Sequence, residues 1–162
     1  MSRSPTYLQL ALGIALGGSL LAVVVPSFVR DLHASRLSEA VRGLHDIGEG
    51  AVAYARGKPP AEAFPPPAPL TPPEVPRGRR VKDPPGTWDH LTWAALGFSI
   101  DHEHYFSFAF ESHNGPDRAT FVARAHGDLD GDGERSTFEL YGECTPEGSR
   151  VLPGLFVDRE VE

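Results

Sequence analysis

The chain has a single cysteine and lacks the common catalytic motifs. Cys144 is the only cysteine among 162 residues, so no disulfide can form within the chain. The sequence also lacks a glycine-rich phosphate loop, a nucleophile elbow and a Ser-His-Asp pattern. These absences predict a protein that is not an enzyme and that folds without disulfides.

A long uncharged run begins just after Arg3, because no charged residue occurs from Ser4 to Val29. Twenty-six helical residues that rise about 1.5 Å each can cross the roughly 30 Å hydrocarbon core of a bilayer. The run is longer than the apolar part of a signal peptide, and no small-x-small cleavage site closes it. We therefore predict a retained transmembrane helix over residues 1–28.

Small residues and a proline interrupt this uncharged run. Gly13, Gly17 and Gly18 would let a second helix approach closely. A simple membrane anchor, in which these glycines have no packing role, fits the sequence equally well. Pro26 predicts a kink rather than an end. Apolar residues then continue at helical spacing and predict an amphipathic half over residues 29–57: Leu37, Val41, Leu44, Gly48, Ala51 and Ala55.

This amino-terminal third resembles the type IV pilins and the type II secretion pseudopilins. The matching family positions, with Pro26 placed on the family's late helix proline, are Thr6, Leu10, Gly18, residues 26–30 and Ser38-Glu39-Ala40. The resemblance implies an α+β lollipop, with a long kinked N-terminal helix and a small C-terminal antiparallel β-sheet head. It implies a structural, minor subunit of a type IV pilus or a type II secretion pseudopilus.

The resemblance also implies partners and a location. The partners are other pilin or pseudopilin subunits, packed through the N-terminal helix, and the inner membrane. The subunit would be a single-pass inner-membrane protein with a periplasmic head before assembly, and part of a periplasmic or extracellular filament afterwards.

The sequence departs from the family pattern at two places. The family is processed after a glycine, whereas Ser4 and Pro5 occupy the matching pair here. Gln9 replaces a glutamate whose carboxylate pairs with a positively charged amine in the apolar filament core. Glutamine can form hydrogen bonds but not this ion pair, so both departures favour a minor or specialised subunit over the bulk one.

Composition divides the rest of the chain into a strap and a head. Eleven of the 27 residues from Pro59 to Pro85 are proline, which predicts a semi-rigid strap without regular structure over residues 58–87. A plain connector and a ligand for a proline-recognising groove are both open. Nine basic and 18 acidic residues follow Lys58, a formal net charge of −9, which argues against nucleic acid as a partner.

The head, residues 88–162, is predicted to be an antiparallel meander. Alternating apolar residues indicate strands over residues 105–110, 120–126 and 136–141, and residues 151–157 add an edge strand. Trp88 and Trp93 are predicted core residues, with carbohydrate stacking as the alternative. His102 and His104 could hold a transition metal, but a surface or core-edge position is the favoured interpretation, because no third ligand is near in sequence.

The sharpest chemical motif runs from Asp128 to Glu139. The spacing D-x-D-x-D-G-x5-E matches a loop that surrounds Ca²⁺ with alternating carboxylates and a final bidentate glutamate. The predicted metal ligands are Asp128, Asp130, Asp132, Ser136 and Glu139. The flanks alternate like strands, so a hairpin turn whose aspartates cap backbone amides is the other interpretation.

Two further function classes stay open. One is a membrane-anchored extracytoplasmic module that binds calcium or carbohydrate and does not polymerise. The other is a tethered hydrolase, for which the sequence offers no catalytic group.

Overall fold

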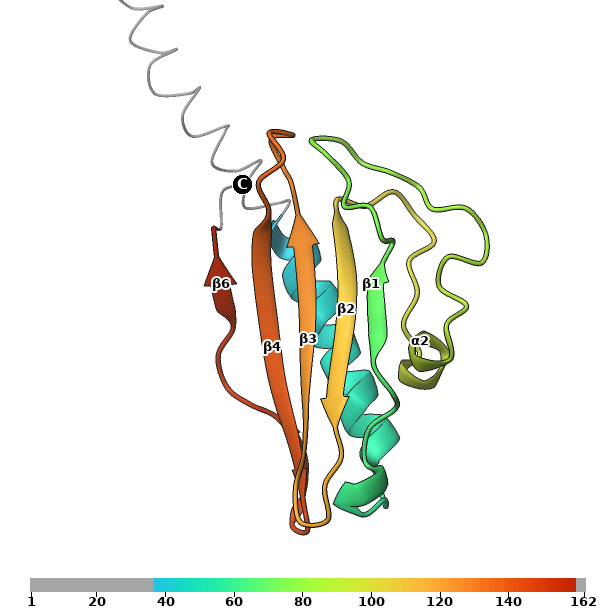
Figure 1. Ribbon diagram of the computed structural model, residues 1–162, viewed down its shortest axis with the longest axis vertical. Helices are drawn as coiled ribbons and strands as arrows, with labels where there is room; N and C mark the ends of the chain where they lie inside the picture. Colours follow the sequence, from blue (N-terminus) through green and yellow to red (C-terminus); the bar gives the residue numbers. More distant parts are fainter. Residues whose placement is uncertain (1–36, 160–162) are drawn as a thin grey trace, which may run out of the picture. The chain divides into compact units, whose positions relative to one another are not determined.

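The computed structural model describes residues 37–159 (Figure 1). Residues 37–55 form a helix, which the 3-10 turn η1 (Pro60–Glu62) follows. The short helix α2 (Leu91–Leu96) lies between the first two strands in sequence. The strands are β1 (Ala68–Thr71), β2 (Phe106–His113), β3 (Ala119–Gly127), β4 (Ser136–Thr145), β5 (Gly148–Val151) and β6 (Phe156–Asp158).

The six strands form one antiparallel sheet, as the alternating sequence pattern predicts. The strand order is β1-β2-β3-β4-β5, and β6 also pairs with β4. The predicted edge strand over residues 151–157 is wrong as a single strand. β5 ends at Val151 and β6 begins at Phe156, because Pro153 and Gly154 separate the two pairings along β4.

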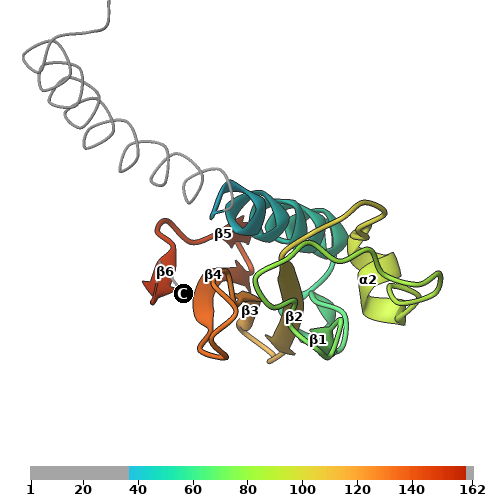
Figure 2. The ribbon, with the colours of Figure 1, turned by 90° about the horizontal axis from the view of Figure 1, so that it is seen from above.

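The 37–55 helix packs against one face of the sheet (Figure 2). Its buried stripe comprises Ala40, Leu44, Ile47, Ala51 and Ala55. The opposing sheet face presents Phe106, Phe108 and Phe110, each 0% exposed. Val41, a predicted member of the stripe, is instead 46% exposed. The rest of the predicted stripe is buried or half-buried, and the helix approaches the ring of Phe108 closely at Gly43.

The predicted fold class, a lollipop with a long kinked N-terminal helix before a small head, is wrong. Over residues 37–159 the chain is mostly antiparallel sheet, and the helix there is not a long apolar one. The physical reason is its exposed flank, where Arg42, Asp46 and Glu49 place a charge on every turn.

The predicted single-pass inner-membrane location is corrected on the same ground. Within residues 37–159, every helix is too short or too polar to span a bilayer. The predicted transmembrane half, residues 1–28, lies outside the described part of the chain. The same holds for the predicted packing residues Gln9, Gly13, Gly17, Gly18 and Pro26, and for the processing pair Ser4 and Pro5.

The proline-rich strap is more regular than predicted. It contains η1 and the edge strand β1, whose Ala68 and Thr71 pair with β2. An edge strand tolerates Pro69, since only one side of an edge strand needs its backbone donors. Two isolated bridges then join the strap to the rest of the domain, at Arg77 with Asp128 and at Val81 with His104.

Candidate metal site and strap anchor

The acidic loop connects β3 to β4, and it brings three of the five predicted metal ligands together. Carboxylate oxygens of Asp128, Asp130 and Asp132 all lie within 4.8 Å of one another. Asp128 is buried, with 2% of its surface exposed, whereas the other two are exposed. A cluster of hard oxygen ligands of this kind suits Ca²⁺ or Mg²⁺ better than a softer transition metal.

The same carboxylates also hold the loop together through backbone amides. Asp128 accepts hydrogen bonds at Oδ1 from the amide of Gly131 (2.7 Å) and at Oδ2 from the amide of Gly133 (3.1 Å). Asp130 accepts one from the amide of Asp132 (3.1 Å), and the Asp132 carboxylate accepts one from the amide of Glu134 (2.7 Å). Each aspartate therefore already shapes the turn, as the hairpin interpretation requires.

The remaining predicted ligands, Ser136 and Glu139, form bonds elsewhere. The hydroxyl of Ser136 is buried and donates to the carbonyl of Gly127 at 3.2 Å. Glu139 lies on β4, opposite Arg124 in the β3–β4 register, and accepts from Arg124 Nε at 2.5 Å. The hairpin register separates this glutamate from the loop, because the motif continues as strand where a calcium loop would turn into helix.

Glu139 belongs to an ionic row on the face of the sheet opposite the helix. Arg124 joins Glu139 to Glu111, whose carboxylate lies 2.7 Å from Arg124 Nη1. Burial alone would raise the pKa of Glu139, but hydrogen bonds from Tyr141 and Arg124 outweigh burial and lower that pKa below its usual value.

A second cluster anchors the strap, and its centre is His104. The imidazole is 0% exposed, and its Nε2 lies 2.9 Å from Asp83 Oδ2 on the strap. Its Nδ1 lies 2.8 Å from the carbonyl oxygen of Phe106. The indole Nε1 of Trp88 donates to the same Oδ2 of Asp83 at 2.8 Å.

This anchor answers the two open questions on histidines and tryptophans. Trp88 and Trp93 are 9% and 0% exposed, so the prediction of core tryptophans is confirmed. Trp93 donates to the hydroxyl of Thr71 at 3.0 Å and so fixes the end of β1. His104 is a core residue, whereas His102 is an exposed neighbour of Asp101, so the structure places the two imidazoles in different environments.

Sequence reasoning missed the pairing of Asp83 with His104. One signal could have revealed half of it, because His104 has the same parity as Phe106, Phe108 and Phe110 and so points to the core. Nothing in the sequence pattern indicates that a carboxylate 21 residues earlier would reach it.

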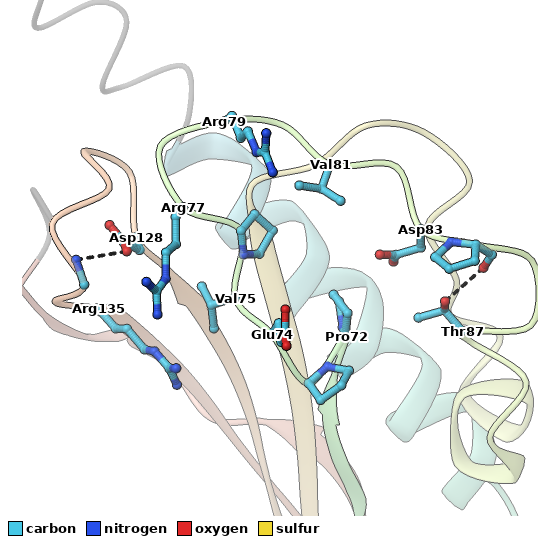
Figure 3. A pocket seen from close by; sticks show the side chains of 14 residues that line it. Pro72, Glu74, Val75, Arg77, Arg79, Val81, Asp83, Thr87, Asp128 and Arg135 are labelled. Atoms are coloured by element: carbon cyan, nitrogen blue, oxygen red, sulfur yellow. Dashed lines mark hydrogen bonds between the residues drawn. The ribbon is translucent and has the colours of Figure 1, made fainter.

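The strap and the acidic loop lie side by side (Figure 3). The amide of Gly78 donates to the carbonyl of Asp128 at 2.7 Å. Between the two segments lies a groove of about 820 Å³, lined by strap residues 72–87 and by Asp128, Gly133 and Arg135 of the loop. The acidic loop and the strap are therefore in direct contact.

Comparison of the chain with protein-family models, with curated proteins and with solved structures gives no match. The likeness to pilins and pseudopilins stays a prediction from the sequence.

Proposed function

We propose that this chain is a structural, non-catalytic and minor subunit of a type IV pilus or a type II secretion pseudopilus. The observation that carries the proposal is one amphipathic helix packed across an antiparallel meander, in the order helix, strap, sheet. The resemblance of the amino-terminal third supports the same assignment.

The chemistry of the described residues favours a structural role over catalysis. His104, Asp83 and Asp128 are buried and bonded within the domain. Glu139 and Ser136 also bond to neighbouring strands. A catalytic group needs a free lone pair or proton aimed at substrate, and these five side chains direct theirs into the fold.

Cross-linking in the native host tests the proposal. Cys144 is buried and its thiol has a pKa raised by burial, so it reacts poorly. A single cysteine can therefore be introduced in turn at Leu91, Phe156 and Val41, which are 61%, 55% and 46% exposed. We expect at least one variant to cross-link to itself or to the major subunit only when the assembly machinery is intact.

The matched control is the parent chain with Cys144 alone, treated identically. If all three variants stay monomeric, or if their products are unchanged in cells without the machinery, the protein does not polymerise. That outcome would favour the rival binding module.

We also propose calcium binding as a second candidate function, favoured by the convergence of Asp128, Asp130 and Asp132. Isolated external modules bind Ca²⁺ with Kd on the order of 0.1 to 1 mM. At 100 times Kd, binding would stabilise the folded state by about 2.7 kcal/mol. The carboxylates repel one another, and a divalent cation would offset that repulsion.

Calorimetric titration of the full chain with CaCl₂ tests this second candidate. The variant Asp130→Asn with Asp132→Asn should abolish the heat, because it removes the two exposed carboxylates and leaves the buried Asp128 intact. Asp117→Asn, in the exposed β2–β3 turn, is the control. Absence of heat with the parent chain, together with an unchanged melting temperature in EDTA, would leave the loop a plain hairpin turn.

A further inference from the structure

Three arginines line the groove between the strap and the acidic loop. Arg77 and Arg79 belong to the strap, Arg135 belongs to the loop, and all three are exposed. Within residues 37–159 none of the three forms an ion pair. The chain has 22 acidic and only 15 basic residues, so these guanidinium groups are not unpaired for lack of carboxylates.

The carboxylates of the same groove leave the arginines available. The side chain of Asp83 is 5% exposed, and its carboxylate contacts His104 and accepts from the indole of Trp88. Asp128 is 2% exposed and accepts from two amides of its own loop. The third carboxylate of the lining, Glu74, is exposed. Three exposed guanidinium groups therefore share the groove with one exposed carboxylate.

The strap wall of the groove is fixed by several contacts. Val75 is buried, and the guanidinium of Arg80 lies over the ring of Tyr105 at 5.2 Å. Val81 and His104 exchange two backbone hydrogen bonds, each 3.0 Å long. The groove is thus formed before a ligand arrives, so binding requires little ordering of the backbone.

Arginines from both walls can contact one ligand. The side chains of Arg77 and Arg135 extend from the strap and from the loop into the same groove (Figure 3). A guanidinium presents a planar fork of N–H donors that matches the two oxygens of a carboxylate. Pro72, Pro76 and Val81 add apolar surface to the same lining. A ligand that uses both features has several carboxylates and some apolar groups.

We propose that this groove binds a short acidic segment of a partner protein that also carries apolar side chains. Its carboxylates pair with the three arginines, and its apolar side chains contact the prolines of the strap. A long polyanion such as nucleic acid is disfavoured, because the residues after Lys58 have a formal net charge of −9. Asp130 and Asp132 add to that repulsion from beside the groove, without lining it. This interaction goes beyond the proposed function, since it holds whether or not the chain enters a filament.

A nuclear magnetic resonance titration of the full chain tests the proposal. The probe is a short blocked peptide of alternating glutamate and leucine, and its control is the same peptide with glutamine in place of glutamate. We expect the acidic peptide to shift the Nε–H signals of Arg77, Arg79 and Arg135 to saturation, and the glutamine peptide to leave them unchanged. The Kd of the acidic peptide should rise with added NaCl, because salt screens exposed charges.

Charge-matched variants locate the binding site. Arg77→Gln and Arg135→Gln should each raise the Kd of the acidic peptide about tenfold, because each removes one charge-assisted pair. Arg42→Gln removes the same charge from the exposed flank of the 37–55 helix and should change the Kd less than about twofold. Neither groove arginine has an ion pair to lose, so both variants should keep the wild-type melting temperature.

Inorganic phosphate and a short oligonucleotide, titrated in the same way, should both bind more weakly than the acidic peptide. The proposal is overturned if the arginine signals do not respond to the acidic peptide, or if either of the other anions binds more tightly. It is also overturned if Arg42→Gln weakens binding as much as the two groove variants do.

Discussion

Two glycines of the 37–55 helix differ in what a side chain would meet. At Gly50 a Cβ atom would overlap the backbone carbonyl of Leu96 in α2, which cannot rotate away. At Gly48 it would lie 2.8 Å from Leu140 Cδ2 and 3.1 Å from Val151 Cγ2, which are side-chain ends that can shift. The same substitution should therefore have different effects two residues apart.

We predict that Gly50→Ala lowers the free energy of unfolding by about 1 to 3 kcal/mol, since overpacking exceeds the helix-propensity gain of about 1 kcal/mol. Gly48→Ala should change it by less than about 1 kcal/mol. Urea denaturation measures both. Equal effects of the two variants would mean that α2 does not pack on the helix as described.

His126 gives the domain a defined pH dependence. Burial, and then the nearby Arg135 and Arg124, lower the pKa of this imidazole below 6.5. The unfolded chain then binds more protons than the folded chain as the pH falls through 6.5, so stability falls with it. His126 accordingly destabilises the fold on acidification, in contrast to a histidine that gains a carboxylate.

We predict that His126→Gln flattens the dependence of unfolding free energy on pH between about 7 and 5. Glutamine keeps a hydrogen-bonding group near the Thr137 hydroxyl, which lies 3.0 Å from His126 Nδ1. His113→Gln, at an exposed position of β2, should leave the curve unchanged. A steeper pH dependence of the unfolding free energy in His126→Gln would contradict the conclusion that His126 destabilises the fold on acidification.

At the scale of elements, the acidic loop is a turn built around one buried carboxylate. We predict that Asp128→Ala destabilises the domain by about 2 to 3 kcal/mol in EDTA, because the amides of Gly131 and Gly133 lose the buried carboxylate that accepts from both. Asp132→Ala, at an exposed position, should cost less than about 1 kcal/mol. Thermal unfolding measures the loss of stability in each variant. Equal losses in Asp128→Ala and Asp132→Ala would contradict this account of the loop.

The strands and the loop show which elements a sequence can reveal. Alternation of Phe106, Phe108 and Phe110 placed β2 on the core correctly, because the side-chain period of a strand is two. β1 was missed because Pro69 and its neighbours signal irregular structure, although an edge position accepts proline. A local sequence pattern can therefore predict a strand, but the position of that strand in the sheet decides whether a proline is tolerated in it.

The candidate site shows the same division between local and distant information. Local spacing brought three aspartates together correctly, because they lie within five residues of one another. It misplaced Glu139, whose partner Arg124 is set by the register of β3 with β4. Asp83 and His104 pair across 21 residues, which only the path of the strap determines.

At the scale of the molecule, the polar side chains of the candidate sites in residues 37–159 form hydrogen bonds and ion pairs within the domain. The helix covers one face of the sheet, and the opposite face carries paired charges such as Arg124 with Glu139 and Arg150 with Glu143. Among the described residues few large apolar side chains are exposed, and the three most exposed, Leu91, Phe156 and Val41, come from different elements.

Quantitative mass spectrometry of filaments sheared from the native host and purified on a density gradient tests the central claim most directly. A structural minor subunit should co-purify with the filaments at a small, constant ratio to the major subunit, and disappear from that fraction when assembly is blocked. Filaments that lack this chain while it stays entirely with the cells would contradict the proposed function.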